Sequence, residues 1–313
     1  MSDDEPTVRV RCALDSQDAS NTPGLKKFVQ AAIRRVIGEE LPTPETEGPY
    51  WGAAHFSLSK VSAFVDASDD ERDLIIAELS RLLVEEAFYI EKAGMAFASK
   101  MALLSESTEE RMLYCLFGAE EASHLAMIAA FMKEAPAPAR TQPFLGFLGE
   151  LIETGERQAL LLCVQVLLEG WGIQHYYSLA EGCQDKSLKA ALVRILADEG
   201  RHHGSGVLLC DPSQLGRHDS AALLEALRRL YAMIQVGPQA VVGAIARHCG
   251  GLTQRQRQQA FQELDAEGST RRKLAQLDAL MAKTRNTQGL REALRSDGLL
   301  EPWDCARCAA VLT

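Results

Sequence analysis

The chain has 313 residues, of which 47% are apolar and 24% are charged, a composition typical of a globular protein with a substantial buried core. Its formal net charge of -10 and its pI near 5.3 are inconsistent with the concentrated positive surface that nucleic acids require. The same acidity disfavours an anionic membrane surface. We therefore expect neither a nucleic acid nor a membrane as a partner.

The acidic start MSDDEPTVRV lacks the positive charge and the apolar stretch of an export signal, so we expect a cytoplasmic protein. The most apolar run, residues 159–168, is shorter than the ~20 residues that a membrane span needs and indicates a buried helix. The eight cysteines follow no disulfide framework, and reduced thiols are expected.

Helical periodicity divides the chain into three regions. Residues 1–67 contain an irregular arm over 1–22, a helix near 24–40 and a linker rich in Pro, Thr and Gly. Residues 211–313 form a helical extension, with two or three amphipathic segments in 219–284 and a CxxC tail. The central region, residues 68–210, is predicted to hold four long helices, at 68–104, 108–133, 144–181 and 186–209.

Two of the four central helices carry a Glu-x-x-His pair. The second helix contains Glu121 and His124 in EEASHLAM, and the fourth contains Glu199 and His202 in DEGRHHGS. Residues three apart share a helix face, so the carboxylate and the imidazole of each pair can reach the same metal ion.

The other two helices each place an acid on an apolar stripe, Glu86 on the first and Glu169 on the third. A buried carboxylate costs several kcal/mol unless it is paired or binds a metal, and two divalent cations would offset that cost. One acid from each of two helices and a Glu-x-x-His from each of the others is the ligand pattern of di-iron and di-manganese bundles. Oxygen donors with imidazole favour iron or manganese over structural zinc.

Other polar residues of these helices are expected away from the metal. Glu85 and Glu120 turn by ~100° from their neighbours, toward the surface or into supporting hydrogen bonds. His175 rotates off the ligand face of the third helix. Cys305 and Cys308 at the C-terminus leave three interpretations open: a redox dithiol that relays electrons, half of a zinc site, or two inert thiols on a flexible tail.

With these residues identified, the chain resembles the ferritin-like di-iron carboxylate superfamily over about residues 68–210. The motifs EEASH and DEGRH are similar to those of the branch that contains acyl-carrier-protein desaturases, bacterial monooxygenases and ribonucleotide reductase small subunits. The resemblance implies an all-α, ferritin-like four-helix bundle with additional N- and C-terminal helices, and a cofactor of two Fe ions, with Mn/Fe as the other choice. It also implies that Asp198 orients His124 through its non-ligating nitrogen.

The sequence departs from this branch at two places. The positions where oxygenases often carry Thr or Ser after the third-helix Glu are Gly172 and Ile173, which argues against a hydroxyl-assisted oxygen step. The position of the radical tyrosine of ribonucleotide reductase is Ile128. Gly172, Ile173 and Tyr176 are instead candidates for lining a substrate pocket, and a plain core position for Tyr176 is the alternative.

The function favoured by these patterns is that of an enzyme, a dioxygen-dependent di-iron oxygenase or oxidase. It would oxidise a small-molecule or carrier-bound organic substrate by hydroxylation, desaturation or N-oxygenation, with an unidentified electron donor and with a homodimer as a compatible assembly. Two hypotheses remain beside it: a ferroxidase or iron-handling protein without an organic substrate, and a metal-stabilised scaffold for a partner protein.

Overall fold

Nearly all of the regular secondary structure in the residues that the structure describes is helical. The structure is a computed structural model, and it describes residues 12, 14–15, 22, 24–38 and 40–312. Within these ranges the β-type pairing is limited to an isolated antiparallel bridge between Trp51 and Cys183. The prediction of an all-α fold is confirmed. Most of the irregular arm expected over residues 1–22 lies outside the described residues.

The described elements are α-helices joined by short 3-10 turns, with one π-helical segment, η3. In chain order they are α1 (Leu25–Ile37), η1 (Leu58–Lys60), α2 (Ser62–Val65), α3 (Asp69–Leu104), α4 (Thr108–Ala129), η2 (Ala139–Thr141), α5 (Pro143–Thr154), α6 (Arg157–Leu160), η3 (Leu161–Leu168), α7 (Glu169–Gly182), α8 (Lys186–Leu209), η4 (Pro212–Gln214), α9 (Arg217–Gln235), α10 (Gln239–His248), α11 (Gln254–Glu263), α12 (Ala266–Lys283), α13 (Gln288–Ser296) and α14 (Cys305–Ala310).

The long helix α3 begins at a capping box. The Ser68 hydroxyl accepts a hydrogen bond from the Glu71 backbone N–H at 3.3 Å, and the Glu71 carboxylate accepts one from the Ser68 backbone N–H at 2.8 Å. Two amide groups that the helix itself leaves unpaired are satisfied in this way. Acids in the first turn, Asp69 and Asp70, complement the positive end of the helix dipole. These local signals explain why the start of the helix is readable from the sequence.

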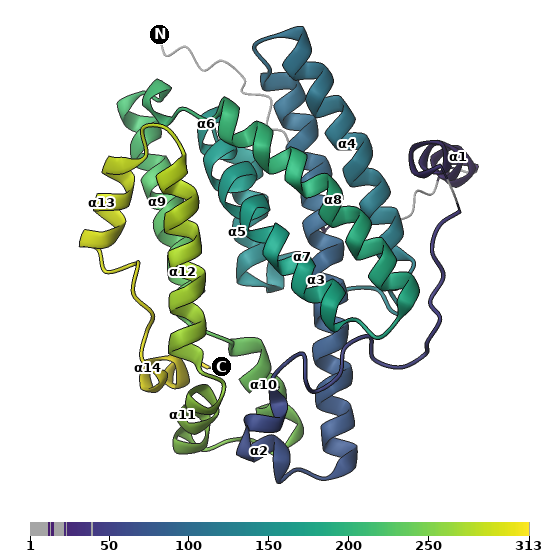
Figure 1. The fold of residues 1–313 in the computed structure, drawn as a ribbon, viewed down its shortest axis with the longest axis vertical. Coiled ribbons are helices and arrows are strands. Elements are labelled where there is room, and N and C mark those ends of the chain that lie inside the picture. Colours follow the sequence, from purple (N-terminus) through teal and green to yellow (C-terminus); the bar gives the residue numbers. More distant parts are fainter. Residues whose placement is uncertain (1–11, 13, 16–21, 23, 39, 313) are drawn as a thin grey trace.

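Four helical rods form the bundle that positions the candidate site: α3, α4, the continuous stretch from α6 through η3 to α7, and α8 (Figure 1). α3 packs along α4, α7 along α8, and α4 against α8. Contacts between α4 and α8 run in opposite chain directions, His124 meeting Asp198 and Glu120 meeting His202, so these helices are antiparallel. α3 and α8 span nearly the predicted ranges, whereas α4 ends at Ala129, four residues before its predicted end.

The predicted third helix, residues 144–181, is wrong as a single helix. It is broken at Gly155, which has extended backbone angles and separates α5 from α6. The buried side chain of Lys100, on α3, donates hydrogen bonds to the carbonyl oxygens of Ile152 and Gly155, each at 2.8 Å. A cation at the C-terminus of a helix satisfies carbonyl groups that have no partner within the helix and complements its dipole. The break is therefore stabilised by a tertiary contact that helical periodicity does not reveal.

The segment η3 winds as a π-helix directly before Glu169. Seven of its eight residues are buried, from Leu161 to Leu167. π-helical turns are rare and occur frequently at functional sites, because they displace the side chains that follow from the α-helical register. The irregular turn therefore sets the direction in which Glu169 enters the bundle.

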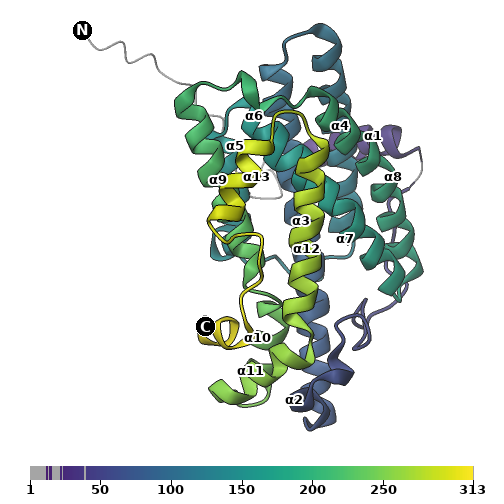
Figure 2. The same cartoon turned by 60° about the vertical axis from the view of Figure 1, so that its left-hand side comes forward.

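Helices outside the bundle share its core. Leu223 and Leu227 of α9 and Leu274 and Leu277 of α12 belong to the same buried apolar cluster as the bundle helices. Residues 219–284 contain four helices rather than the two or three predicted, since α11 and α12 are separate. Figure 2 shows α12 running lengthwise beside the bundle, and it packs against η3 and α7.

The C-terminal segment is packed and helical, so the expectation of a flexible tail is wrong. Cys305 and Cys308 lie in α14, against α11, and are 5% and 1% exposed. Both belong to a second apolar cluster that also includes Ile75 and Leu79 of α3. Both thiols are free, and burial raises the pKa of Cys305 to about 12. No group of metal-ligating side chains in the described part of the chain includes either cysteine.

No helix within the described residues combines the length and the apolar character needed to cross a membrane.

Candidate metal centre

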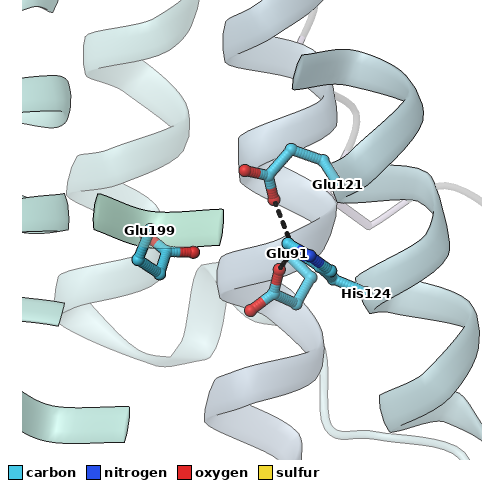
Figure 3. Close-up of side chains that lie close together, drawn as sticks. All are labelled: Glu91, Glu121, His124 and Glu199. Carbon is cyan, nitrogen blue, oxygen red and sulfur yellow. Dashed lines mark ion pairs between the residues drawn. The ribbon is translucent and has the colours of Figure 1, made fainter. Parts of the chain in front are cut away.

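A buried group of acidic and imidazole side chains lies at the centre of the bundle. Glu91 of α3, Glu121 and His124 of α4, and Glu199 of α8 each offer one ligand atom, and these atoms all lie within 4.8 Å of one another. None of the four residues is more than 6% exposed. Figure 3 shows the carboxylates of Glu91 and Glu121 on either side of His124, with Glu199 approaching from α8.

His202 and Glu169, the other two predicted ligands, adjoin this group. His202 is 1% exposed, and its Nδ1 atom lies 3.1 Å from a carboxylate oxygen of Glu121. Glu169 lines the same cavity as Glu91, Glu121 and Glu199, and its Oε2 atom is buried. The structure thus brings five of the six predicted ligands, Glu121, His124, Glu169, Glu199 and His202, into one neighbourhood.

Glu86 is not part of the group, and the acid that α3 contributes is Glu91. The two residues are five apart, a rotation of about 140° around the helix beyond one full turn. The sequence pattern pointed to Glu86 because α3 is buried on more than one side and therefore has several apolar stripes. The stripe that contains Glu86 is only one of them. The stripe through Val84, Ala87 and Ala98 also contains Glu91.

A glycine makes room for the carboxylate of Glu121. A Cβ atom on Gly94 of α3 would lie 2.4 Å from Glu121 Oε2, a distance that no side chain tolerates. Gly94 follows Glu91 by three residues, on the same face of α3. An acid followed three residues later by glycine is the local signal that could have pointed to Glu91 instead of Glu86.

The two histidines are held by reciprocal contacts between α4 and α8. Asp198 Oδ2 lies 3.0 Å from His124 Nε2, and Glu120 Oε2 lies 2.9 Å from His202 Nε2. Arg201 joins the two acids, because it donates hydrogen bonds to Glu120 at 2.9 Å and to Asp198 at 2.6 Å. Each acid directly precedes the Glu of its own Glu-x-x-His pair and supports the histidine of the other. Asp198 thus lies where the resemblance implies, and Glu120 has the same role on the opposite helix.

These contacts leave the Nδ1 atoms of both histidines directed at the carboxylates. His124 Nδ1 lies 3.2 Å from Glu91 Oε2 and 3.9 Å from Glu121 Oε2. Holding one ring nitrogen by a carboxylate sets the orientation of the ring and frees the other nitrogen for a cation. Glu91 is also held, since the Tyr176 hydroxyl donates a hydrogen bond to its other oxygen.

The electrostatics of the group fit bound cations. Glu91 Oε2, His124 Nδ1 and Glu169 Oε2 are buried and form no hydrogen bond, although the first two lie 3.2 Å apart. Burial, reinforced by the neighbouring carboxylates, raises the pKa of both Glu169 and Glu199 well above the usual range of a carboxyl group. Burial likewise raises the pKa of Glu91 to about 7. Cations would bind these three atoms and remove the repulsion among the acids. Carboxylates and imidazoles without a thiolate suit iron or manganese.

A cavity of 260 Å³ opens on the carboxylates. Gly172 and Tyr176, two of the three predicted pocket residues, line it, and Ile173 does not. Apolar side chains from α5 and η3 form much of the remaining wall, which also includes Ile90 of α3. The cavity can therefore hold a small, largely apolar molecule next to the acidic group.

Fold and site together define a ferritin-like helical bundle whose core contains a carboxylate and histidine group suited to metal. Residues 82–206 match the family model described as ferritin-like domain. The chain therefore contains a ferritin-like domain, which carries all of Glu91, Glu121, His124, Glu169, Glu199 and His202. Neither the curated proteins nor the solved structures yielded a match to this chain.

Proposed function

We propose that this protein is a dioxygen-dependent di-iron oxidoreductase that oxidises a small organic substrate by hydroxylation, desaturation or N-oxygenation. The observation that carries the proposal is the cavity of 260 Å³, whose wall includes both apolar side chains and the carboxylates of Glu91, Glu121 and Glu199. An iron-storage protein needs only a path for hydrated ions to its acids. An apolar chamber beside the acids favours an organic substrate.

We assign the metal ligands to the six side chains that adjoin one another, with Glu91 in place of Glu86. They are Glu91, Glu121, His124, Glu169, Glu199 and His202. When bound there, a pair of iron ions would supply the electrons that dioxygen needs and that no side chain can provide. A Mn/Fe pair would use the same donors.

The residues around the ligands act on orientation and on protons. Asp198 and Glu120 hold the two imidazole rings, and Tyr176 donates its proton into a hydrogen bond with Glu91. The buried walls of η3 keep bulk water away from the acids, which strengthens every electrostatic interaction inside the chamber. A substrate in the cavity would lie directly against these oriented groups.

Metal analysis and oxygen uptake test the proposal together. Protein purified from iron-supplemented cells should contain about two irons per chain, and its reduced form should consume dioxygen. A Glu121→Ala variant, matched with an exposed Glu109→Gln variant as the control, should lose both properties. Hundreds of irons per particle in a hollow assembly would support the ferroxidase hypothesis instead. Retained iron without any oxygen uptake would support the hypothesis that the protein is a metal-stabilised scaffold for a partner protein.

A further inference from the structure

Besides Tyr176, which is hydrogen-bonded to Glu91, three ionisable side chains line the cavity beyond the proposed metal ligands: Glu86 of α3, His175 of α7 and Lys273 of α12. Within the described part of the chain, none of the three takes part in a hydrogen bond or an ion pair. None of their polar atoms is among the fully buried atoms that lack a hydrogen bond. Their polar atoms are therefore accessible to a ligand. Unpaired polar groups in a mostly apolar chamber are the usual means of recognising the polar end of a ligand.

The three side chains lie at one end of the cavity, away from the proposed metal ligands. Glu86 precedes Glu91 by five residues, about 7.5 Å along α3, and His175 follows Glu169 by six residues, about 9 Å along α7. Paired contacts show that α3 is antiparallel to α4, α4 to α8, and α8 to the rod that contains α7, so α3 and α7 run in opposite directions. Glu86 and His175 are therefore displaced from the proposed metal ligands toward the same end of the bundle. The electrostatic influence of Glu86 on His175 agrees with this placement.

Lys273 brings a positive charge to this end from outside the bundle. Its ammonium nitrogen lies 6.0 Å from the centroid of the Trp171 ring, and Lys273 lines the cavity although the residue is exposed. Burial lowers the pKa of His175, with Glu86 opposing that shift, so the imidazole offers a neutral donor and acceptor. One end of the cavity thus combines a carboxylate, an ammonium and a neutral imidazole.

Glu86 also lines a second cavity, which is shared with His55 and Ser269. A residue in the wall of both cavities stands where the two approach each other. The wall of the first cavity also contains the apolar side chains of Leu148, Ile152 and Leu168.

The charges of Glu86 and Lys273, at the polar end of the cavity, balance each other. Four carboxylates and two divalent cations at the proposed metal centre would sum to zero, and Glu86 and Lys273 carry opposite charges. A ligand with a single charge would pair with one of these two groups and leave the other without a partner in the cavity wall. A ligand that carries both an ammonium and a carboxylate pairs with both.

We infer that the cavity binds a zwitterionic amino acid with an apolar side chain, its ammonium on Glu86, its carboxylate on Lys273 and His175, and its apolar part directed at the metal ligands. This inference rests on the proposed function and specifies its substrate class. The distance of about 7.5 Å between the polar end and Glu91 along α3 places the reacting carbon several bonds from the ammonium.

Binding of three six-carbon probes to the full-length, iron-loaded protein under oxygen-free conditions tests the inference. L-norleucine carries both charges, hexanoate only the carboxylate, and hexylamine only the ammonium. In calorimetric titrations, norleucine should bind about tenfold or more tightly than either of the other two, because it forms one more charged hydrogen bond. A Glu86→Gln variant should weaken norleucine and hexylamine, and a Lys273→Met variant should weaken norleucine and hexanoate. The exposed Lys283→Met variant on the same helix serves as the control.

Norleucine that binds no more tightly than the single-charge probes, or that binds both variants as it binds the wild type, would overturn the inference. Should Glu86→Gln fail to fold, the exposed Lys273→Met variant decides the question alone. Oxygen uptake by the reduced wild-type protein separates the two hypotheses. Uptake without discrimination among the probes contradicts only the amino-acid ligand, whereas selective norleucine binding without uptake contradicts only the proposed activity.

Discussion

Asp198 of α8 lies 3.0 Å from the Nε2 atom of His124 on α4, and the same contact is repeated in the opposite direction between Glu120 and His202. Although burial opposes it, the carboxylates of Asp198, Glu121 and Glu91 raise the pKa of His124 well above its usual value. Each Glu-x-x-His helix thus supplies one histidine and orients the histidine of its partner. Arg201 neutralises the two orienting acids from the surface side.

Removing the charge of Asp198 should weaken metal binding without changing the volume of the side chain. In an Asp198→Asn variant the ring of His124 loses its ionic partner, and loss of such a partner typically costs 10- to 100-fold in metal affinity. Competition with a chelator measures that affinity, with Glu109→Gln on α4 as the exposed control. We expect Glu120→Gln to produce a loss of similar size through His202. Wild-type affinity in both variants would show that these contacts do not support the ligands.

The choice between Glu86 and Glu91 can be decided by a matched pair of variants. Glu91→Gln should lower the iron content sharply, because Glu91 belongs to the buried group. Glu86→Gln should retain iron, because Glu86 lies outside that group although it lines the same cavity. Iron per chain, measured by elemental analysis after gel filtration, is the readout. Loss of iron from Glu86→Gln alone would restore the assignment that the apolar stripe suggested.

A methyl group at Gly94 should disturb the metal site by displacing the carboxylate of Glu121. Its Cβ would lie 2.4 Å from Glu121 Oε2, so in Gly94→Ala the carboxylate has to move and the metal affinity should fall. Gly200→Ala is the control, because a Cβ there meets nothing within 4 Å, and loss of the helical glycine should stabilise α8 by about 0.4 to 1 kcal/mol. Equal metal affinities in the two variants would contradict the need for glycine beside Glu121.

Metal removal should lower thermal stability. Cations that bind only the folded chain stabilise it by about 2.7 kcal/mol at a hundredfold excess over Kd, and their removal leaves Glu169 and Glu199 buried among other acids. Scanning calorimetry with and without a chelator measures the change in Tm. The Glu121→Ala variant should be insensitive to the chelator, which separates metal loss from other effects of the reagent. A wild-type Tm that is the same in both conditions would argue against a bound metal.

Asp185 should make stability sensitive to acid. It is the N-cap residue of α8, and its carboxylate accepts hydrogen bonds from the backbone N–H groups of Leu188 at 2.9 Å, Glu45 at 2.7 Å and Thr46 at 3.0 Å. Burial raises its pKa, but these bonds outweigh burial and lower the pKa below its usual value. The stability that the carboxylate contributes is therefore present above its ordinary pKa of about 3.9 and is lost as the pH falls through the lower folded-state value.

An Asp185→Ala variant checks this link. At pH 7 it should lose roughly 2 kcal/mol of unfolding free energy, from the cap and from the bonds to residues 45 and 46. In urea titrations the difference from the wild type should shrink as the pH is lowered below about 4. Asp66→Ala, at an exposed position before α3, should show neither effect. A difference that stays constant with pH would mean that the carboxylate charge does not contribute.

The sequence was most informative where structure depends on neighbours along one helix. The capping signal at Ser68 and the Asp185 start of α8 are local, and the Glu-x-x-His spacing alone places each carboxylate beside its histidine. Contacts between helices were predictable only through resemblance, as for Asp198 and His124. Glu120 has an equivalent contact with His202. Because Glu120 is rotated outward on its own helix, the sequence could not decide whether it lies at the surface or supports a ligand through a hydrogen bond.

By itself, the sequence determined the helical class, three of the four long helices predicted for the bundle and five of the six side chains that adjoin at its centre, because periodicity and three-residue spacing are properties of a single helix. Only the tertiary structure decided that Glu91 rather than Glu86 faces the other acids, that Lys100 ends α5 at Gly155, and that Cys305 and Cys308 are buried. A helix covered on several sides presents several apolar stripes. Which of them faces the centre depends on where the other helices pack.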